Sequence, residues 1–230
     1  MKVKAKSEET RSRILAAALE LFRREGFEAA TMRDIASAAE VATGAAYYYF
    51  ASKDAIVLAF YDQASKDMQP RLEAALLRSK DLKERLAGLL RVKLDYFAPS
   101  RGLLGALAAH SDPEHPLSPF SETSRPIREN DIAVFARALH ESRTTIPADL
   151  QPHLPRLLWL YQMGILLFWI YDRSPGQKRT AALLEQSLTL VVRLIKVANL
   201  PLMKPLRKKV LDLIAAATDV EGPAARHQPD

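Results

Sequence analysis

Residues 7–54 contain three short helical patterns divided by strong stop and start signals, and this punctuation leaves few ways to fold the segment. Apolar residues recur at helical spacing in the first pattern, at Ile14, Leu15, Ala18, Leu21 and Phe22. Gly26 suits the left-handed position after a helix, and Thr31 with Asp34 forms a capping box that begins the second helix. Only residues 40–42 separate the second helix from the third. Because so short a link forces a steep crossing, the segment predicts a helix-turn-helix.

The third predicted helix, residues 43–49, begins with side chains too small and polar to form core. Its first turn holds Thr43, Gly44, Ala45 and Ala46. Small side chains there let the backbone approach a DNA groove closely. Ser52 can cap the following helix, which places Lys53 at an N-terminus where backbone amides and the helix dipole favour an anion. A DNA phosphate would meet both the lysine and those amides.

This region resembles the DNA-binding domain of the tetracycline-repressor (TetR) family of bacterial regulators, over about the first quarter of the chain. The matching residues are Ile14, Leu15, Ala17, Ala18, Leu21, Phe22, Gly26, Phe27, Thr31, Ile35, Ala36, Val41, Gly44, Tyr47, Phe50 and Lys53. Glu40 stands at a turn position that is usually Gly in the family, Ala42 where a capping Ser is common, and Ala46 where a Leu is common. The resemblance predicts the same fold, with a weakly capped recognition helix.

We expect a compact set of residues to contact DNA. Tyr47 and Lys53 should meet phosphates, and the resemblance places both Tyr47 and Tyr48 at the DNA. Arg33, Thr43 and Tyr48 should lie nearer the base edges. The full expected set is Thr31, Arg33, Thr43, Gly44, Ala45, Tyr47, Tyr48 and Lys53. Tyr49 and Phe50 are expected to be core aromatics instead.

The charge of the chain favours an anionic partner without identifying one. The formal net charge is +6 over 230 residues. The first 60 residues carry nine Lys/Arg and eight Asp/Glu, a net of only +1. A positive face must therefore come from the placement of charges. Lys2, Lys4 and Lys6 form a basic stretch that is either a solubilising tail or an arm for the minor groove.

The rest of the chain predicts a separate and more apolar helical body, so the whole fold is expected to be all-α. We expect a DNA-binding domain over 1–54, a ligand-binding and dimerisation domain over 55–220, and a disordered tail over 221–230. The first residues lack the apolar segment of a signal peptide, which makes the cytoplasm the expected location.

The segment 157–171 is almost entirely apolar, with Gln162 its one clearly polar residue. A membrane span needs about 20 such residues, and charged residues flank this shorter run, so no membrane contact is expected. A helix that is apolar all round must be buried all round, which calls for a partner chain, a ligand or both. We expect this helix and the next to form a four-helix interface in a twofold dimer, as the last two helices of the body do in TetR-like proteins. The expected interface residues are Leu184, Leu188, Val191, Val192 and Ile195.

A small-molecule effector site is expected between helices of the body, because polar residues interrupt its apolar patterns. The candidates are Tyr96, His110, Arg128, Trp159, Tyr161 and Gln162. Gln162 needs either a protein neighbour or a ligand, since a buried amide without a partner is costly. Trp159 and Trp169 are either core residues or walls for a flat or aliphatic ligand.

Neither a metal site nor an enzyme is indicated. His110 and His115 are joined by a proline-containing turn, which argues for a polar loop or a pocket rim. The chain has no cysteine, no Gly-rich phosphate loop and no GxSxG or HExxH motif. No cofactor is expected.

We interpret the chain as a homodimeric regulator that binds a palindromic DNA operator, most simply a repressor released by an apolar or amphipathic small molecule. One alternative is a DNA-binding regulator controlled by a protein partner or lacking an effector. Another is a helical carrier or enzyme with a degenerate DNA-binding domain.

Overall fold

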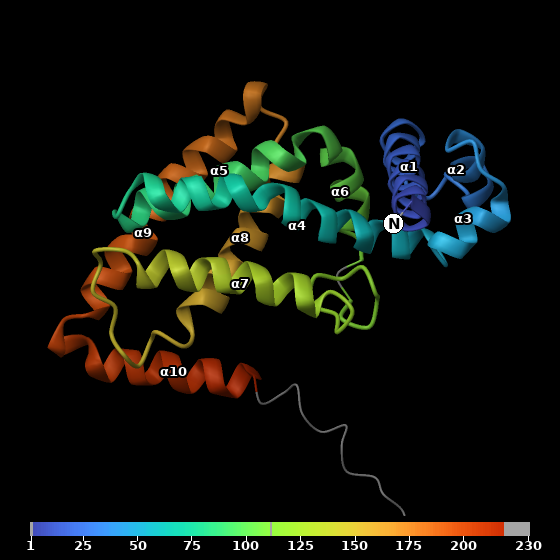
Figure 1. The fold of residues 1–230 in the computed structure, drawn as a ribbon. Coiled ribbons are helices and arrows are strands. Elements are labelled where there is room, and N and C mark those ends of the chain that lie inside the picture. Colours follow the sequence, from blue (N-terminus) through green and yellow to red (C-terminus); the bar gives the residue numbers. More distant parts are fainter. Residues whose placement is uncertain (1, 111, 219–230) are drawn as a thin grey trace, which may run out of the picture.

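The computed structural model describes residues 2–110 and 112–218, and every regular element in these ranges is helical. The α-helices are α1 (Lys2–Glu25), α2 (Met32–Ala38), α3 (Thr43–Tyr49), α4 (Lys53–Arg78), α5 (Leu82–Phe97), α6 (Arg101–Leu107), α7 (Arg125–His140), α8 (Leu154–Tyr171), α9 (Lys178–Ala198) and α10 (Lys204–Thr218). Figure 1 shows α1, α2 and α3 together at one end of the molecule, with α4 running from them into the larger body. The all-α prediction is confirmed, and the expected tail at 221–230 lies outside the described residues.

Local signals set the ends of the N-terminal helices. Thr31 accepts a hydrogen bond from the Asp34 amide while the Asp34 carboxylate accepts one from the Thr31 amide, which completes the predicted capping box. The Ser52 hydroxyl caps α4 by accepting from the Ala55 amide. Gly26 has φ 91°, a left-handed conformation that costs glycine little. No side chain caps α3, as the unusual Ala42 predicts.

Glu40 adopts a backbone conformation that suits glycine better. Its φ is 53°, in the left-handed region, in the short link between α2 and α3. This is the position where the family pattern usually has Gly. A side chain there costs about 1–2 kcal/mol, because its Cβ crowds the following carbonyl oxygen. The sharp turn is therefore kept at the expense of local strain.

Two apolar cores hold the chain together. The N-terminal core gathers residues of α1, α2 and α3 with Ile56, Val57 and Phe60 of α4. It also includes Leu103, Leu107 and Leu117, which follow α5 in the chain. The body core is built from the rest of α4 with α5, α7, α8 and α9. Because α4 contributes to both cores, the division of the chain near residue 54 stays a proposal about its organisation.

The first and last helices extend the predicted pattern. α1 continues back to Lys2, so Lys2, Lys4 and Lys6 belong to a helix rather than an extended arm. α10 carries an ion pair from Arg207 to Asp149 at 2.9 Å, and Arg207 also donates to the Ala198 carbonyl. These contacts tie α10 to the segment before α8 and to the end of α9.

α8 contains the apolar run and begins at Leu154, three residues earlier than predicted. Among the described helices it is the one long and apolar enough, by length and composition, to cross a membrane. A core helix of a soluble protein meets the same two criteria. Leu158, Ile165 and Trp169 are buried against the rest of the chain, which fits the core interpretation.

Candidate DNA interface and effector cavity

The outer surface of α3 presents the residues expected to reach DNA. Tyr47 is 52% exposed and Tyr48 is 82% exposed, while Ala46 and Phe50 face inward and are buried. Thr43 and Gly44 are exposed, and no atom lies within 4 Å of the position a Gly44 Cβ would occupy. Neighbouring exposed aromatic side chains form an apolar patch, and such a patch can mark an interaction site. The half-buried Tyr49 instead stacks edge-on against Tyr48, and its hydroxyl accepts from Ser7.

α2 contributes a second part of this surface. Arg33 is exposed beside the recognition helix. Thr31 is exposed too, but its hydroxyl donates to the Asp34 carboxylate at 2.5 Å as part of the cap. These hydrogen bonds from Thr31 hold the pKa of the Asp34 carboxyl below its usual range. Any contact between Thr31 and DNA must therefore leave its cap hydrogen bonds with Asp34 in place.

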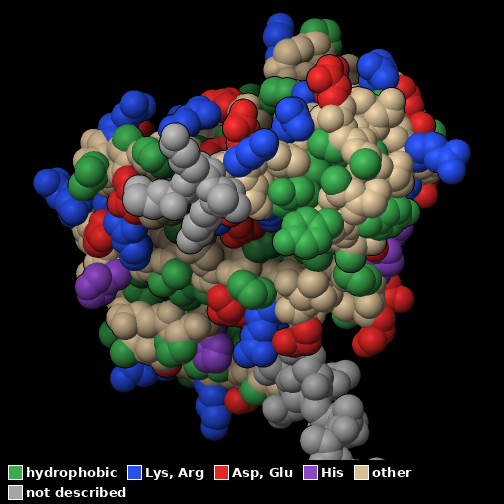
Figure 2. Space-filling model, turned by 45° about the vertical axis from the view of Figure 1, so that its right-hand side comes forward, with side chains coloured by type: hydrophobic (Ala, Val, Ile, Leu, Met, Phe, Trp, Pro, Cys, Tyr) green, Lys and Arg blue, Asp and Glu red, His purple; other side chains and the backbone are tan. Residues whose placement is uncertain are grey.

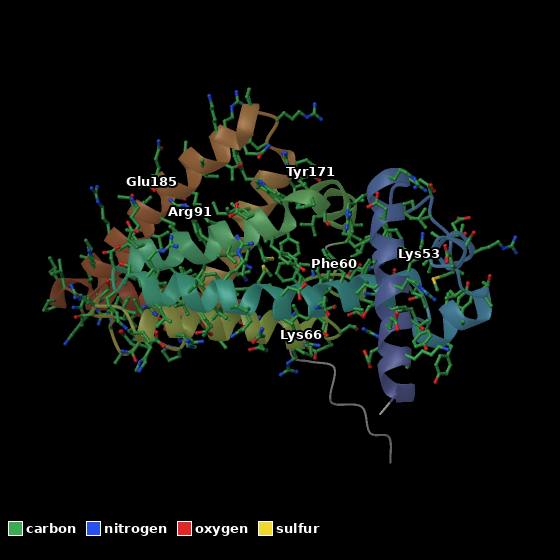
Figure 3. All side chains as sticks on the ribbon, turned by 45° about the horizontal axis from the view of Figure 1, so that its top comes forward. Lys53, Phe60, Lys66, Arg91, Tyr171 and Glu185 are labelled. Atoms are coloured by element: carbon green, nitrogen blue, oxygen red, sulfur yellow. The ribbon has the colours of Figure 1, made fainter. Side chains whose placement is uncertain are left out.

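Lys53 is placed differently from the simple expectation. Its ammonium donates to the carbonyl oxygens of Phe27 at 2.6 Å and Glu28 at 3.2 Å. It also lies 4.6 Å from the centroid of the Phe27 ring. Figure 3 shows Lys53 where α4 meets the N-terminal helices. Lys53 thus links α4 to the turn after α1, and a phosphate contact would have to share it with these carbonyls.

Charge over the surface is mixed rather than segregated. In the space-filling view of Figure 2, Lys and Arg side chains are interspersed with Asp and Glu, and hydrophobic side chains gather in the right-hand part of that face. This agrees with the net charge of +1 in the first 60 residues, counted as nine basic minus eight acidic. Attraction to DNA must therefore come from the position of a few side chains.

The body contains a cavity of about 400 Å³ between helices. Its apolar wall includes Met68, Phe97, Leu104, Leu117, Phe120, Trp159, Leu166 and Ile170. Four of the six predicted effector residues line it: His110, Arg128, Trp159 and Gln162. Trp159 stacks edge-on against Phe120, with ring centroids 5.5 Å apart. Cavities of this size between helices of a bundle commonly bind small molecules.

Tyr96 and Tyr161, which the sequence placed in the effector site, do not line this cavity. The Tyr96 hydroxyl donates to Asp67 at 2.9 Å, and the Tyr161 hydroxyl lies 2.6 Å from that of Ser187. Burial and the Asp67 hydrogen bond raise the pKa of Tyr96 to about 12. Each tyrosine has its polar partner in a neighbouring helix, which a single sequence does not reveal.

The polar end of the cavity combines the expected Gln162 with Lys93 and Asp131, which the sequence did not predict. The Lys93 ammonium lies 2.6 Å from Asp131 Oδ2, and its side chain is only 3% exposed. Gln162 is 1% exposed, and its Nε2 donates to the same Asp131 oxygen at 3.1 Å. Burial lowers the pKa of Lys93, and Asp131 opposes that shift. Lys93 lies on the apolar stripe of α5 between Leu89 and Phe97, and a lysine at such a position indicates a buried cation that needs a partner.

His110 and His115 lie against each other in the loop after α6. Their rings stack with centroids 4.1 Å apart, and His115 Nδ1 accepts a hydrogen bond from the Leu117 amide. Within residues 2–110 and 112–218, no group of three or more potential metal ligands is present. The loop instead packs beside the cavity, where His110 forms part of the wall.

The cavity wall is shared with the N-terminal core. Leu107 and Leu117 line the cavity and also pack into the core that supports α1, α2 and α3. His110 lies against the Phe27 ring, with centroids 6.4 Å apart, and its Nε2 is 3.8 Å from Glu28 Oε1. Phe27 and Glu28 are also the residues whose carbonyls hold Lys53. The cavity wall is therefore in direct contact with the DNA-binding end of the molecule.

The expected dimer residues lie on the wrong face of α9. Leu184, Leu188, Val192 and Ile195 are at most 5% exposed in the single chain, and Val191 packs partly against the same body core. The four buried residues face α5 and the rest of the protomer, so they are not available to a partner chain. The outward side of this helix pair carries a different apolar set, which we call the outer α8–α9 face. It comprises Leu157, Leu160, Leu167, Phe168, Tyr171, Leu190, Leu194 and Val197, each at least 36% exposed.

Comparison with known proteins assigns the class. The family model "Bacterial regulatory proteins, tetR family" matches residues 14–60, and "Tetracyclin repressor-like, C-terminal domain" matches residues 85–214. The chain belongs to the TetR family, as the sequence resemblance predicts, and is a DNA-binding transcriptional regulator of a non-enzymatic family.

Individual relatives agree with this assignment. The chain is 27% identical over 187 residues to the HTH-type transcriptional repressor KstR of Mycolicibacterium smegmatis, covering 81% of this chain and 87% of KstR. Among solved structures, a TetR-family regulator from Streptomyces coelicolor superimposes with a TM-score of 0.61 at 21% identity, covering 82% of this chain and 97% of that one. FadR from Bacillus subtilis in complex with stearoyl-CoA gives a TM-score of 0.60 at 18% identity, covering 79% and 97%. At these identities the structures support the fold.

Proposed function

We propose that this protein is a dimeric repressor that binds a palindromic operator and is released by an apolar or amphipathic small molecule. The observation that carries the proposal is the shared wall between the cavity and the N-terminal core, formed by Leu107 and Leu117. A ligand that prefers one arrangement of this wall would shift the position of the DNA-binding end. Such a regulator would work in the cytoplasm, where it meets the chromosome.

The DNA contact is proposed to come from the outer surfaces of α2 and α3. Tyr48 and Arg33 are the most direct candidates for the base edges, because both are exposed. Tyr47 would meet a phosphate, and Lys53 would do so together with the amides at the start of α4. Thr31, Thr43, Gly44 and Ala45 complete the proposed set.

The dimer is proposed to form through the outer α8–α9 face. Its side chains are apolar and exposed in the single chain, and a patch of this kind marks an interaction site. A twofold dimer would place the two α3 helices about 34–36 Å apart or at a multiple of that spacing, which requires a roughly palindromic operator.

The ligand is proposed to be largely aliphatic or flat. The cavity wall is mostly aliphatic and aromatic. Of its charged residues, Lys93 and Asp131 are paired with each other, and Arg128 donates to the carbonyls of Pro119 and Ser121. The FadR structure with stearoyl-CoA supports the idea that a body of this fold accommodates an acyl chain.

The test begins with DNA from the region flanking the gene of this protein. Fluorescence anisotropy over a range of salt concentrations should show specific binding that weakens linearly on a logarithmic salt scale. A cavity ligand should then release the operator. The Leu104→Trp variant, whose larger side chain would occupy part of the cavity, should bind the operator but resist release by the ligand. Specific binding that no cavity ligand weakens would favour a regulator controlled by a protein or lacking an effector. Absence of sequence preference would favour a carrier.

A further inference from the structure

The polar end of the cavity contains a hydrogen-bond acceptor that has no donor. Gln162 Oε1 is buried and has no hydrogen-bond partner among the residues that the structure describes. Gln162 lines the cavity, and it is almost fully buried. A buried polar atom without a partner is costly, so this end of the cavity favours a molecule that supplies one.

The orientation of the Gln162 amide is fixed by its neighbour. Asp131 Oδ2 accepts from Gln162 Nε2 at 3.1 Å. A flipped amide would set its oxygen against that carboxylate, and two acceptors facing each other repel. The oxygen is therefore the group that remains for a ligand.

The charge at this end of the cavity is already balanced. Lys93 and Asp131 form a close pair at 2.6 Å, which leaves neither an unpaired cation for a carboxylate nor an unpaired anion for an ammonium group. Arg128, the other cation in the wall, is directed to the loop before α7 through the carbonyls of Pro119 at 2.8 Å and Ser121 at 3.0 Å. A charged ligand group beside Gln162 would lose its hydration, while Lys93 and Asp131 at this end are already paired with each other.

We propose that the effector carries an uncharged hydrogen-bond donor, such as an alcohol hydroxyl, at the end seated against Gln162. The rest of the molecule is aliphatic or flat and lies along Met68, Leu104 and Trp159. This inference rests on the proposed role of the cavity as the effector site. It adds the polarity of the head group: a donor rather than a carboxylate or an ether.

A set of probes with the same chain tests the head group. Decan-1-ol, decyl methyl ether and decanoate share an alkyl chain, but the ether has no donor and decanoate is anionic. Binding to the full-length protein can be followed by tryptophan fluorescence, because Trp159 lies in the cavity wall and the chain has only two tryptophans. The alcohol should bind roughly 3- to 10-fold more tightly than either of the other two, the value of one net hydrogen bond.

Two variants locate the preference. Gln162→Met keeps the length of the side chain and removes the acceptor, so the alcohol and the ether should bind equally. Met68→Leu changes an apolar wall residue and should keep the preference of the wild type. Should Gln162→Met fail to fold, the comparison of the three probes in the wild-type protein still decides.

Three results would overturn the inference: equal binding of alcohol and ether to the wild type, a preference that persists in Gln162→Met, or no binding of decan-1-ol. Equal binding would mean that water or a protein group satisfies Gln162 Oε1. The proposed function fails separately. If the protein prefers the alcohol but recognises no operator, the head-group inference stands and the proposed repressor function is wrong. If ligands release the operator without any preference for a donor, the repressor function stands and the head-group inference is wrong.

Discussion

The DNA-binding end and the body of this regulator use polar groups in opposite ways. At the DNA-binding end, Thr31, Asp34 and Ser52 form short-range caps at the surface, and Tyr47 and Tyr48, which we propose to contact DNA, are exposed. In the body, Arg85, Lys93 and Gln162 are buried, with partners far away in the sequence. The polar groups at the DNA-binding end therefore set where helices begin and leave the exposed tyrosines open to a partner molecule, while those in the body fix how helices pack.

The largest effect should come from removing a buried cation of the body. Arg85 is fully buried, and it donates to the Leu76 carbonyl at 2.8 Å and to the Glu141 carboxylate at 2.7 Å. Arg85→Met removes this donor from the Leu76 carbonyl and leaves Glu141 with its longer contact to Arg137 at 3.6 Å, so the free energy of unfolding should fall by about 3–5 kcal/mol. Urea denaturation measures it.

Arg91 on the same helix is the matched control. Its side chain is 60% exposed, and its ion pair with Glu185 is long at 3.9 Å (Figure 3). Arg91→Met should change stability by less than about 1 kcal/mol. Equal losses in the two variants would remove the contrast between buried and exposed charges.

Assembly should respond to the outer α8–α9 face and not to the inner face of α9. Leu194 is 58% exposed, so Leu194→Asp should fold normally but weaken dimer association by about 3 kcal/mol or more, because a charge would be buried at the interface. Sedimentation velocity measures dimer association, and circular dichroism measures folding.

Leu188→Asp provides the comparison on the same helix. Leu188 is 0% exposed, so an aspartate there should prevent folding rather than release a folded monomer. A folded Leu194→Asp dimer would place the interface elsewhere.

At the DNA-binding end, the exposed aromatic should matter for binding and not for stability. Tyr48→Ala should weaken operator binding by about 1–3 kcal/mol and reduce specificity at one base position. Because Tyr48 is 82% exposed, its unfolding free energy should change by less than about 0.5 kcal/mol. Anisotropy titrations with operator and scrambled DNA separate these effects, and a uniform loss on both sequences would make Tyr48 a phosphate contact.

The smallest effect should come from the strained turn. Glu40→Gly removes the side chain at a residue with φ 53°, which should stabilise the protein by about 1 kcal/mol. The gain is reduced by the greater freedom of glycine in the unfolded chain. Thermal unfolding measures the change, and Glu40→Ala is the control, since it removes the carboxylate but keeps the strained Cβ. A gain in Glu40→Ala equal to that in Glu40→Gly would assign the effect to charge.

The sequence was informative wherever structure depends on neighbouring residues. The bounds of α3 match the predicted 43–49, and the capping box at Thr31 is confirmed. These features depend on contacts within one or two helical turns. The cavity was anticipated in its general place, because residues such as Gln162 interrupt apolar runs.

Long-range pairing could not be read in the same way. α9 has apolar residues on more than one side, and the periodicity of Leu184, Leu188 and Ile195 does not say whether they face α5 or a second chain. Similarly, nothing near Tyr96 in the sequence indicates that Asp67 would accept a hydrogen bond from its hydroxyl. Lys53 was recognised as a cation at a helix start, but its carbonyl partners lie about 25 residues earlier.

The shared wall has a consequence for anyone who wishes to turn this regulator into a biosensor. Leu107 and Leu117 touch both the cavity and the core of the DNA-binding end, so we expect a substitution that reshapes the pocket there to alter operator affinity in the unliganded state as well. Met68, Leu166 and Ile170 border the cavity but are absent from that core. Libraries that retune ligand choice should therefore begin on α4 and α8, and keep the two leucines constant until background expression is under control.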